Sequence, residues 1–181
     1  MANTHTSTNS YNNSNTILKG FLAEPDGCFK ATDKLTKEEI IEAGRTLVIE
    51  DFLKRQLNVM QSPTMVKNYL SARIEGMEQE VFLVMFLDNR HQLIVDEIMF
   101  YGTINAASVY PREVAKHALQ HNAAAVVLAH NHPSGNLEPS NADRNITKRL
   151  KDALNLIDVN VIDHIIVGKG DCTSFAERGI L

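Results

Sequence analysis

Two histidines, a serine and an aspartate stand close together in the segment AHNHPSGNLEPSNAD, residues 129–143. His130 and His132 are two residues apart at the end of an apolar run, so on an extended strand both imidazoles point the same way. Asp143 falls in the first turn expected of the following helix. Two neutral imidazoles and a carboxylate suit zinc, and a fourth tetrahedral position left to water is typical of a catalytic site. The segment therefore predicts that His130, His132 and Asp143 bind one zinc ion, Zn2+.

A helix start explains part of the same pattern. Ser140 is a good N-cap, and Asp143 is favoured near the positive end of a helix. Capping does not explain why both histidines lie at a strand end, aimed where that helix begins. The two interpretations are compatible, because a serine hydroxyl can accept a bond from the helix backbone and still donate its proton elsewhere.

The elements that must position these residues alternate between strands and helices. Apolar runs predict strands over residues 80–88, 93–101, 123–130 and 160–168. Helical spacing with capping residues predicts helices over residues 35–57, 62–75 and 140–157, and another from Pro111 onward. This order indicates an α/β (α+β) protein, in which helices pack on the faces of a mixed sheet.

Composition divides the chain and excludes some classes of protein. Residues 1–15 are almost wholly Ser, Thr and Asn, which predicts a disordered tail. We expect a helical extension over residues 16–60 and the domain that carries the chemistry over residues 61–181. The net charge of -4 lacks the basic surplus that is typical of DNA-binding proteins, so DNA binding would need a local basic patch.

Cysteine usage and hydropathy indicate the compartment. Cys28 and Cys172 lack CxxC spacing, so neither a disulfide framework nor a cysteine zinc site is indicated, and a reducing environment fits best. No stretch approaches the roughly 18 apolar residues of a membrane span. We therefore expect a cytoplasmic protein that does not bind membranes.

The segment HNHPSG followed by PSNAD resembles the JAMM signature, HxHPx(6)SxxD, of the JAB/MPN metalloprotease superfamily. The residues that match are His130, His132, Pro133, Ser140 and Asp143. The segments GTIN, YPREV, DHIIVG and SFAERG are similar to those of the bacterial RadC branch, especially its short prophage-associated members, over about residues 60–181. The resemblance implies a JAB/MPN-type, cytidine-deaminase-like mixed sheet with helices on its faces and a zinc-dependent hydrolase activity.

The resemblance also implies a catalytic glutamate at the start of the first core strand. Glu75, Glu78 and Glu80 are the nearest candidates, and Glu75 falls in the preceding helix. We choose Glu80, because it directly precedes the apolar run and is in phase with Phe82 on one face of the strand. Glu78 is the alternative.

These residues together would hydrolyse an amide bond without a covalent intermediate. Zinc lowers the pKa of a bound water to about 7. Glu80 would take the proton of that water and return it to the leaving amine, while Ser140 would donate a hydrogen bond to the oxyanion. We therefore expect a zinc metallopeptidase or isopeptidase that acts on a peptide or protein substrate.

Other classes of metal site match the sequence less well. Zinc deaminases need HxE and a downstream PCxxC, but His132 stands where the glutamate should be and no cysteine pair follows. His117 and His121 lie one helical turn apart and could chelate a metal, but the helix dipole explains them more simply. His164 is expected to be a structural histidine held by a hydrogen bond.

A DNA-repair-associated accessory role, acting on or near DNA, is the alternative function. The helix that carries Asp143 also carries a basic stripe, which by default is a solvated face but would also attract a phosphate backbone. The stripe consists of Arg144, Lys148, Arg149 and Lys151. RadC proteins bear a DNA-repair label, and longer members carry a helix-hairpin-helix region. The glycine-containing hairpins of that region are missing from the residues before the catalytic domain here.

Overall fold

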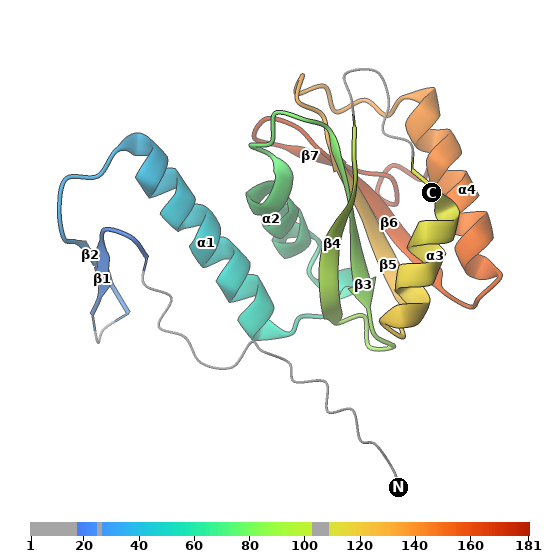
Figure 1. Cartoon of the computed structure of the whole chain (residues 1–181), viewed down its shortest axis with the longest axis horizontal. Helices are drawn as coiled ribbons and strands as arrows, with labels where there is room; N and C mark the ends of the chain where they lie inside the picture. The colour runs from blue at the N-terminus through green and yellow to red at the C-terminus, as the bar shows by residue number, and fades with distance from the viewer. Residues whose placement is uncertain (1–17, 25–26, 103–108) are drawn as a thin grey trace, which may run out of the picture. The chain divides into compact units, whose positions relative to one another are not determined.

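The structure is a computed structural model that describes residues 18–24, 27–102 and 109–181. The chain divides into two compact units, Met1–Gly44 and Arg45–Leu181. Helix α1 (Lys37–Arg55) begins in the first unit and ends in the second (Figure 1). The tail expected over residues 1–15 and residues 103–105 of the GTIN segment lie outside the described residues.

The first unit contains a short hairpin before α1. Strands β1 (Phe21–Ala23) and β2 (Phe29–Ala31) pair antiparallel, and Gly27 between them has a φ of 85°, which glycine adopts without strain. The extension expected to be helical is therefore part hairpin. Thr36 caps α1 as a reciprocal capping box, because its hydroxyl accepts from the Glu39 amide while the Glu39 carboxylate accepts from the Thr36 amide.

The second unit is a five-stranded mixed sheet in the order β4-β3-β5-β6-β7. Neighbouring strands are antiparallel except for the parallel pair β5 and β6. The strands are β3 (Val81–Leu87), β4 (Leu93–Tyr101), β5 (Ala125–Asn131), β6 (Asn160–Val167) and β7 (Cys172–Ser174). The mixed α/β architecture predicted from the sequence is confirmed.

Helices cover both faces of this sheet. Figure 1 shows α2 on one side of it and α3 and α4 on the other. The helices are α2 (Pro63–Ile74), α3 (Pro111–Gln120) and α4 (Asn141–Asn155), and a 3-10 turn, η1 (Val59–Gln61), precedes α2. The strands and helices predicted between residues 62 and 168 are present with their ends shifted by at most two residues.

Strand β3 forms the middle of both apolar cores, because all of its side chains are buried. Leu83 and Met85 pack into the core beneath α2, while Phe82 and Phe86 pack into the core beneath α3 and α4. Both faces of the strand are covered, which is why its sequence reads as a continuous apolar run. None of the helices in the described ranges is long and apolar enough to cross a membrane.

Candidate metal centre

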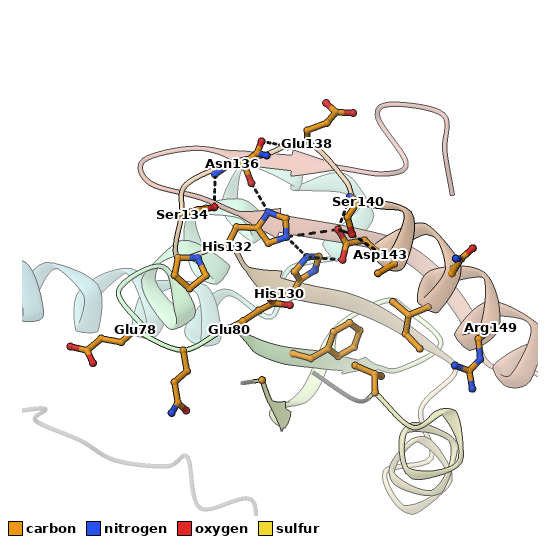
Figure 2. Close-up of a pocket in the computed structure, with 18 of the residues that line it drawn as sticks. Glu78, Glu80, His130, His132, Ser134, Asn136, Glu138, Ser140, Asp143 and Arg149 are labelled. Carbon is orange, nitrogen blue, oxygen red and sulfur yellow. Dashed lines mark hydrogen bonds and ion pairs between the residues drawn. The ribbon is translucent and has the colours of Figure 1, made fainter. Parts of the chain in front are cut away.

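The end of β5 and the start of α4 bring three donor side chains together (Figure 2). His130 Nε2 lies 2.9 Å from His132 Nε2 and 3.4 Å from Asp143 Oδ1. His132 Nε2 lies 3.8 Å from Asp143 Oδ2. The three donor atoms are all within 4.8 Å of one another, so the residues expected to be zinc ligands are close enough to share one cation.

The helix cap orients the carboxylate of this group. Ser140 is the N-cap of α4, and its hydroxyl accepts a hydrogen bond of 3.1 Å from the Asp143 amide. The Ser140 hydroxyl and backbone amide both donate to Asp143 Oδ2, each at 2.7 Å. Capping and metal binding are therefore complementary, because the cap holds one carboxylate oxygen while the other faces His130. In this arrangement the Ser140 hydroxyl proton is directed at Asp143 and not into the groove.

A chain of buried hydrogen bonds sets the tautomer of His130. The Thr147 hydroxyl donates to the backbone carbonyl of Asp143, so it must accept from His164 Nδ1–H at 2.6 Å. His164 Nε2 is then unprotonated and accepts from His130 Nδ1–H at 2.8 Å. His130 Nε2 is consequently left with a lone pair directed at His132 and Asp143. Partners beyond the ligands fix the tautomers of metal-binding histidines in the same way.

The ring of His132 is held similarly. Its Nδ1–H donates to the backbone carbonyl of Asn136, which leaves Nε2 unprotonated. Two imidazole lone pairs then face each other at 2.9 Å, an arrangement that is repulsive unless a cation lies beside both. Burial lowers the pKa of His130 to about 4, so the His130 ring is neutral at neutral pH. The donor set and its tautomers therefore fit a metal ion such as zinc.

Glu80 lies beside this group and Glu78 does not. Figure 2 shows the Glu80 carboxylate directed toward the two histidines, whereas the Glu78 side chain extends away from them. Burial raises the pKa of the Glu80 carboxyl, and of its charged neighbours His132 lowers that pKa while Asp143 raises it. A raised pKa makes this carboxylate a stronger base, which suits it to accept a proton from water.

Asn131 holds the segment that carries Glu80. Its side-chain oxygen accepts from the Val81 amide at 2.7 Å, and its side-chain nitrogen donates to the carbonyls of Met77 and Gln79 at 3.2 and 3.1 Å. Asn131 is 1% exposed, so these bonds are shielded from water. The motif in the sequence assigns Asn131 no chemical step. The sequence does contain a signal for a positioning role. Asn131 stands between His130 and His132, so on a strand its amide side chain points to the opposite face from the two imidazoles.

A groove of about 1310 Å³ lies above the candidate centre. Glu80, His132 and Asp143 line it, and so do Tyr110 before α3 and Arg149 on α4. This volume exceeds the range of about 300–1,000 Å³ that is common for small-molecule pockets. The groove therefore has room for part of a polymer as well as for a small ligand.

Acidic neighbours pair with two of the four residues of the basic stripe on α4. Lys148 forms an ion pair of 3.0 Å with Asp152, and Arg144 lies 3.7 Å from Glu138. Glu138 also pairs with Arg178 at 3.0 Å. Such exposed pairs contribute little to stability, but they reduce the local excess of positive charge.

The fold and the site together define a mixed α/β domain with a His, His, Asp centre beside a glutamate. The family model of the RadC-like JAB domain matches residues 60–180. The chain thus belongs to the RadC-like JAB family, as the motif predicted.

Relatives from several organisms carry a similar region. A UPF0758 protein of Pseudoalteromonas translucida is 60% identical over 123 residues, which are 68% of this chain and 55% of the relative. A UPF0758 protein of Vibrio cholerae is 58% identical over 131 residues, 72% of this chain and 58% of the relative. A UPF0758 protein of Nitrosococcus oceani is 57% identical over 141 residues, 78% of this chain and 62% of the relative. The chain spans a little over half the length of these relatives.

Proposed function

We propose that this chain is a zinc-dependent hydrolase that cleaves an amide bond in a peptide or isopeptide. The observation that carries the proposal is the pair of imidazole nitrogens, His130 Nε2 and His132 Nε2, that face each other unprotonated beside the Asp143 carboxylate. Membership of the JAB family supports a hydrolase. The UPF0758 names of the relatives assign no activity, so the chemistry is argued from the site.

His130, His132 and Asp143 would hold the zinc ion. When bound, zinc acidifies a coordinated water and polarises a carbonyl oxygen. The buried hydrogen bonds behind His130 and the cap behind Asp143 keep these donors in place, which reduces the reorganisation needed for binding.

Glu80 would act as the general base and then as the general acid. Its carboxylate faces the two histidines, and its raised pKa favours proton uptake from water and return of that proton to the leaving amine. Asn131 would act only as a positioning residue, by fixing the backbone on either side of Glu80. Ser140 would donate to the oxyanion once its hydroxyl proton is released from Asp143.

The groove supports a polymeric substrate. It extends from the Glu80 segment to α4, and the candidate ligands His130, His132 and Asp143 are among the residues that line it. Its floor combines apolar side chains such as Phe82 and Ile146 with the polar donors of the centre. A polypeptide segment, with alternating amide groups and side chains, matches such a lining.

Metal content and hydrolysis, measured on the same variants, test the proposal. Wild-type protein should bind zinc and cleave members of peptide and isopeptide libraries, and Asp143→Asn should lose zinc from this centre. Glu80→Gln should keep its zinc and lose about 10²–10⁴-fold in turnover, because it removes the proton acceptor alone.

Glu78→Gln is the matched control, since this carboxylate also lines the groove but faces away from the histidines. Its turnover should fall far less than that of Glu80→Gln. Zinc binding unaffected by Asp143→Asn, or equal activity of Glu80→Gln and wild-type protein, contradicts the proposal. Cleavage of DNA and not of peptides would favour a DNA-associated function instead.

A further inference from the structure

A second cluster of side chains of the types that bind metals lies away from the groove. Glu97 on β4 contacts His117 and His121 on α3. Glu97 Oε2 lies 2.5 Å from His117 Nδ1, and Glu97 Oε1 lies 2.8 Å from His121 Nε2. The donor atoms of the three residues are all within 4.8 Å of one another. The helix dipole, which sequence reasoning invoked for the two histidines, does not account for the carboxylate between them.

The fold explains how the cluster forms. His117 and His121 are four residues apart, so they lie on one face of α3. Glu97 pairs with Val84 across β3 and β4, and therefore shares the sheet face that packs against α3 and α4. The Phe86 ring lies beneath both imidazoles, with ring centroids 6.5 Å from His117 and 5.1 Å from His121. An apolar floor on one side and solvent on the other leave the donors reachable by an ion.

This cluster is separate from the candidate centre at His130. His130 stacks on Phe82, whereas His117 and His121 contact Phe86, four residues further along β3. Four residues of a strand span about 13 Å, so the two groups lie at different places along the same sheet face. They share no side chain and can be altered independently.

We propose that Glu97, His117 and His121 form a second metal centre that binds a divalent transition-metal ion such as zinc. Two imidazoles and one carboxylate are a common zinc ligand set, and imidazole also suits copper and nickel. Three protein ligands leave one tetrahedral position to water. The ion would tie the edge strand β4 to α3.

Only small movements are needed to admit an ion. Zinc ligands at about 2.0–2.2 Å from the metal in a tetrahedral site are about 3.3 Å from one another. The carboxylate oxygens must therefore move back from the imidazoles by under about 1 Å, which side-chain rotation supplies. Burial acts to raise the pKa of Glu97, but the hydrogen bonds with His121 and His117 outweigh it and hold that pKa below its ordinary value. The group is therefore an anion at neutral pH.

Zinc titration of the full chain, followed by calorimetry and by Co2+ absorption spectra, tests the second centre. Wild-type protein should bind one ion more than Glu97→Gln or His121→Gln, and each substitution should weaken this site at least tenfold. His91→Asn is the matched control, because it removes a histidine that is not part of the cluster, and asparagine tolerates the positive φ of 58° at this position. Circular dichroism checks that each variant is folded.

The two centres are distinguished by combining variants. In Asp143→Asn protein, zinc should still raise the melting temperature, because an ion bound only by the native state stabilises it. Adding Glu97→Gln to that protein should abolish the increase. Glu97→Gln and His121→Gln variants that bind zinc with the stoichiometry and affinity of wild-type protein overturn the second centre and leave the first untouched. The second centre is also overturned if Asp143→Asn is the only substitution that reduces zinc binding.

Discussion

Thr147 offers a test of the hydrogen-bond chain that sets the tautomer of His130. The Thr147 hydroxyl accepts from His164 Nδ1–H and donates to the Asp143 carbonyl, and Thr147 is 3% exposed. Thr147→Val keeps the shape of the side chain and removes this acceptor. The fully buried His164 must then leave an N–H unsatisfied or move its proton to Nε2.

Moving the proton to Nε2 costs less free energy than leaving an N–H unsatisfied, and it reverses the direction of the hydrogen bond between His164 and His130. His164 Nε2–H would donate to His130 Nδ1, so His130 would carry its proton on Nε2, the nitrogen that faces the metal position. Zinc binding would have to restore the original tautomer and bury an unsatisfied N–H, at about 1–3 kcal/mol. That energy corresponds to roughly 5- to 150-fold weaker binding, close to the 10- to 100-fold typical of lost outer-shell partners.

The assay is zinc affinity measured by competition with a chromogenic chelator at pH 7.5. Thr147→Ser is the matched control, because it keeps the hydroxyl and loses only a methyl group. We expect wild-type and Thr147→Ser proteins to bind zinc at the first centre within a few-fold of each other and Thr147→Val to bind at least tenfold more weakly. Equal affinities of the Val and Ser variants, with both folded, would refute the tautomer argument.

Three further predictions follow from the same site. Asn131→Ala should lower the free energy of unfolding by about 1–3 kcal/mol, because the hydrogen bonds of the Asn131 side chain hold the Glu80 segment. The variant should also turn over substrate more slowly while it keeps its zinc affinity. Denaturant unfolding and enzyme kinetics measure these effects, and unchanged turnover contradicts the positioning role. Ser140→Ala should cost about 1 kcal/mol of stability through loss of the cap, measured by thermal unfolding, and should also weaken zinc binding. Burial lowers the pKa of His130 from 6.5 to about 4 and that of His164 well below 6.5, so the unfolded chain binds more protons between these values. Metal-free protein should therefore lose stability as the pH falls below about 6.5, by about 3 kcal/mol at pH 4 from His130 alone; urea unfolding at several pH values measures it, and a flat profile from pH 7 to pH 5 opposes it.

Local patterns in the sequence predicted much of the fold and the group of candidate ligands. Strand β3 is apolar on both faces, and the serine and aspartate at the start of α4 are typical of a capped helix. His130 and His132 are two residues apart, so a single strand sets their relative direction. Each of these features depends on neighbours within a few residues.

Features that join distant segments were not predictable in this way. Glu97 lies 20 residues before His117, and the face on which it points depends on a sheet register that shifts between Phe82 and Leu83. The amide of Asn131 bonds to backbone about 50 residues earlier. The spacing of residues along the chain carries no information about such partners, because only the assembled sheet brings them together.

The two clusters should differ in affinity, and the difference follows from what each must give up on binding an ion. At the first centre, the partners of His130 and His132 lie outside the ligand group, and an ion relieves the repulsion between the two Nε2 lone pairs. At the second centre, the histidines already bond to Glu97, so an ion must replace two hydrogen bonds and shift each ring proton to the other nitrogen of its imidazole.

Substoichiometric zinc should therefore occupy the first centre before the second. Stepwise Co2+ titration of wild-type protein, with Asp143→Asn and Glu97→Gln as references for each spectrum, measures the order of filling. If the second centre fills before the first, the hydrogen-bonded tautomers of His130 and His132 do not govern zinc affinity. The first centre, whose donors are the more ordered, would then bind zinc less tightly than the more exposed second centre.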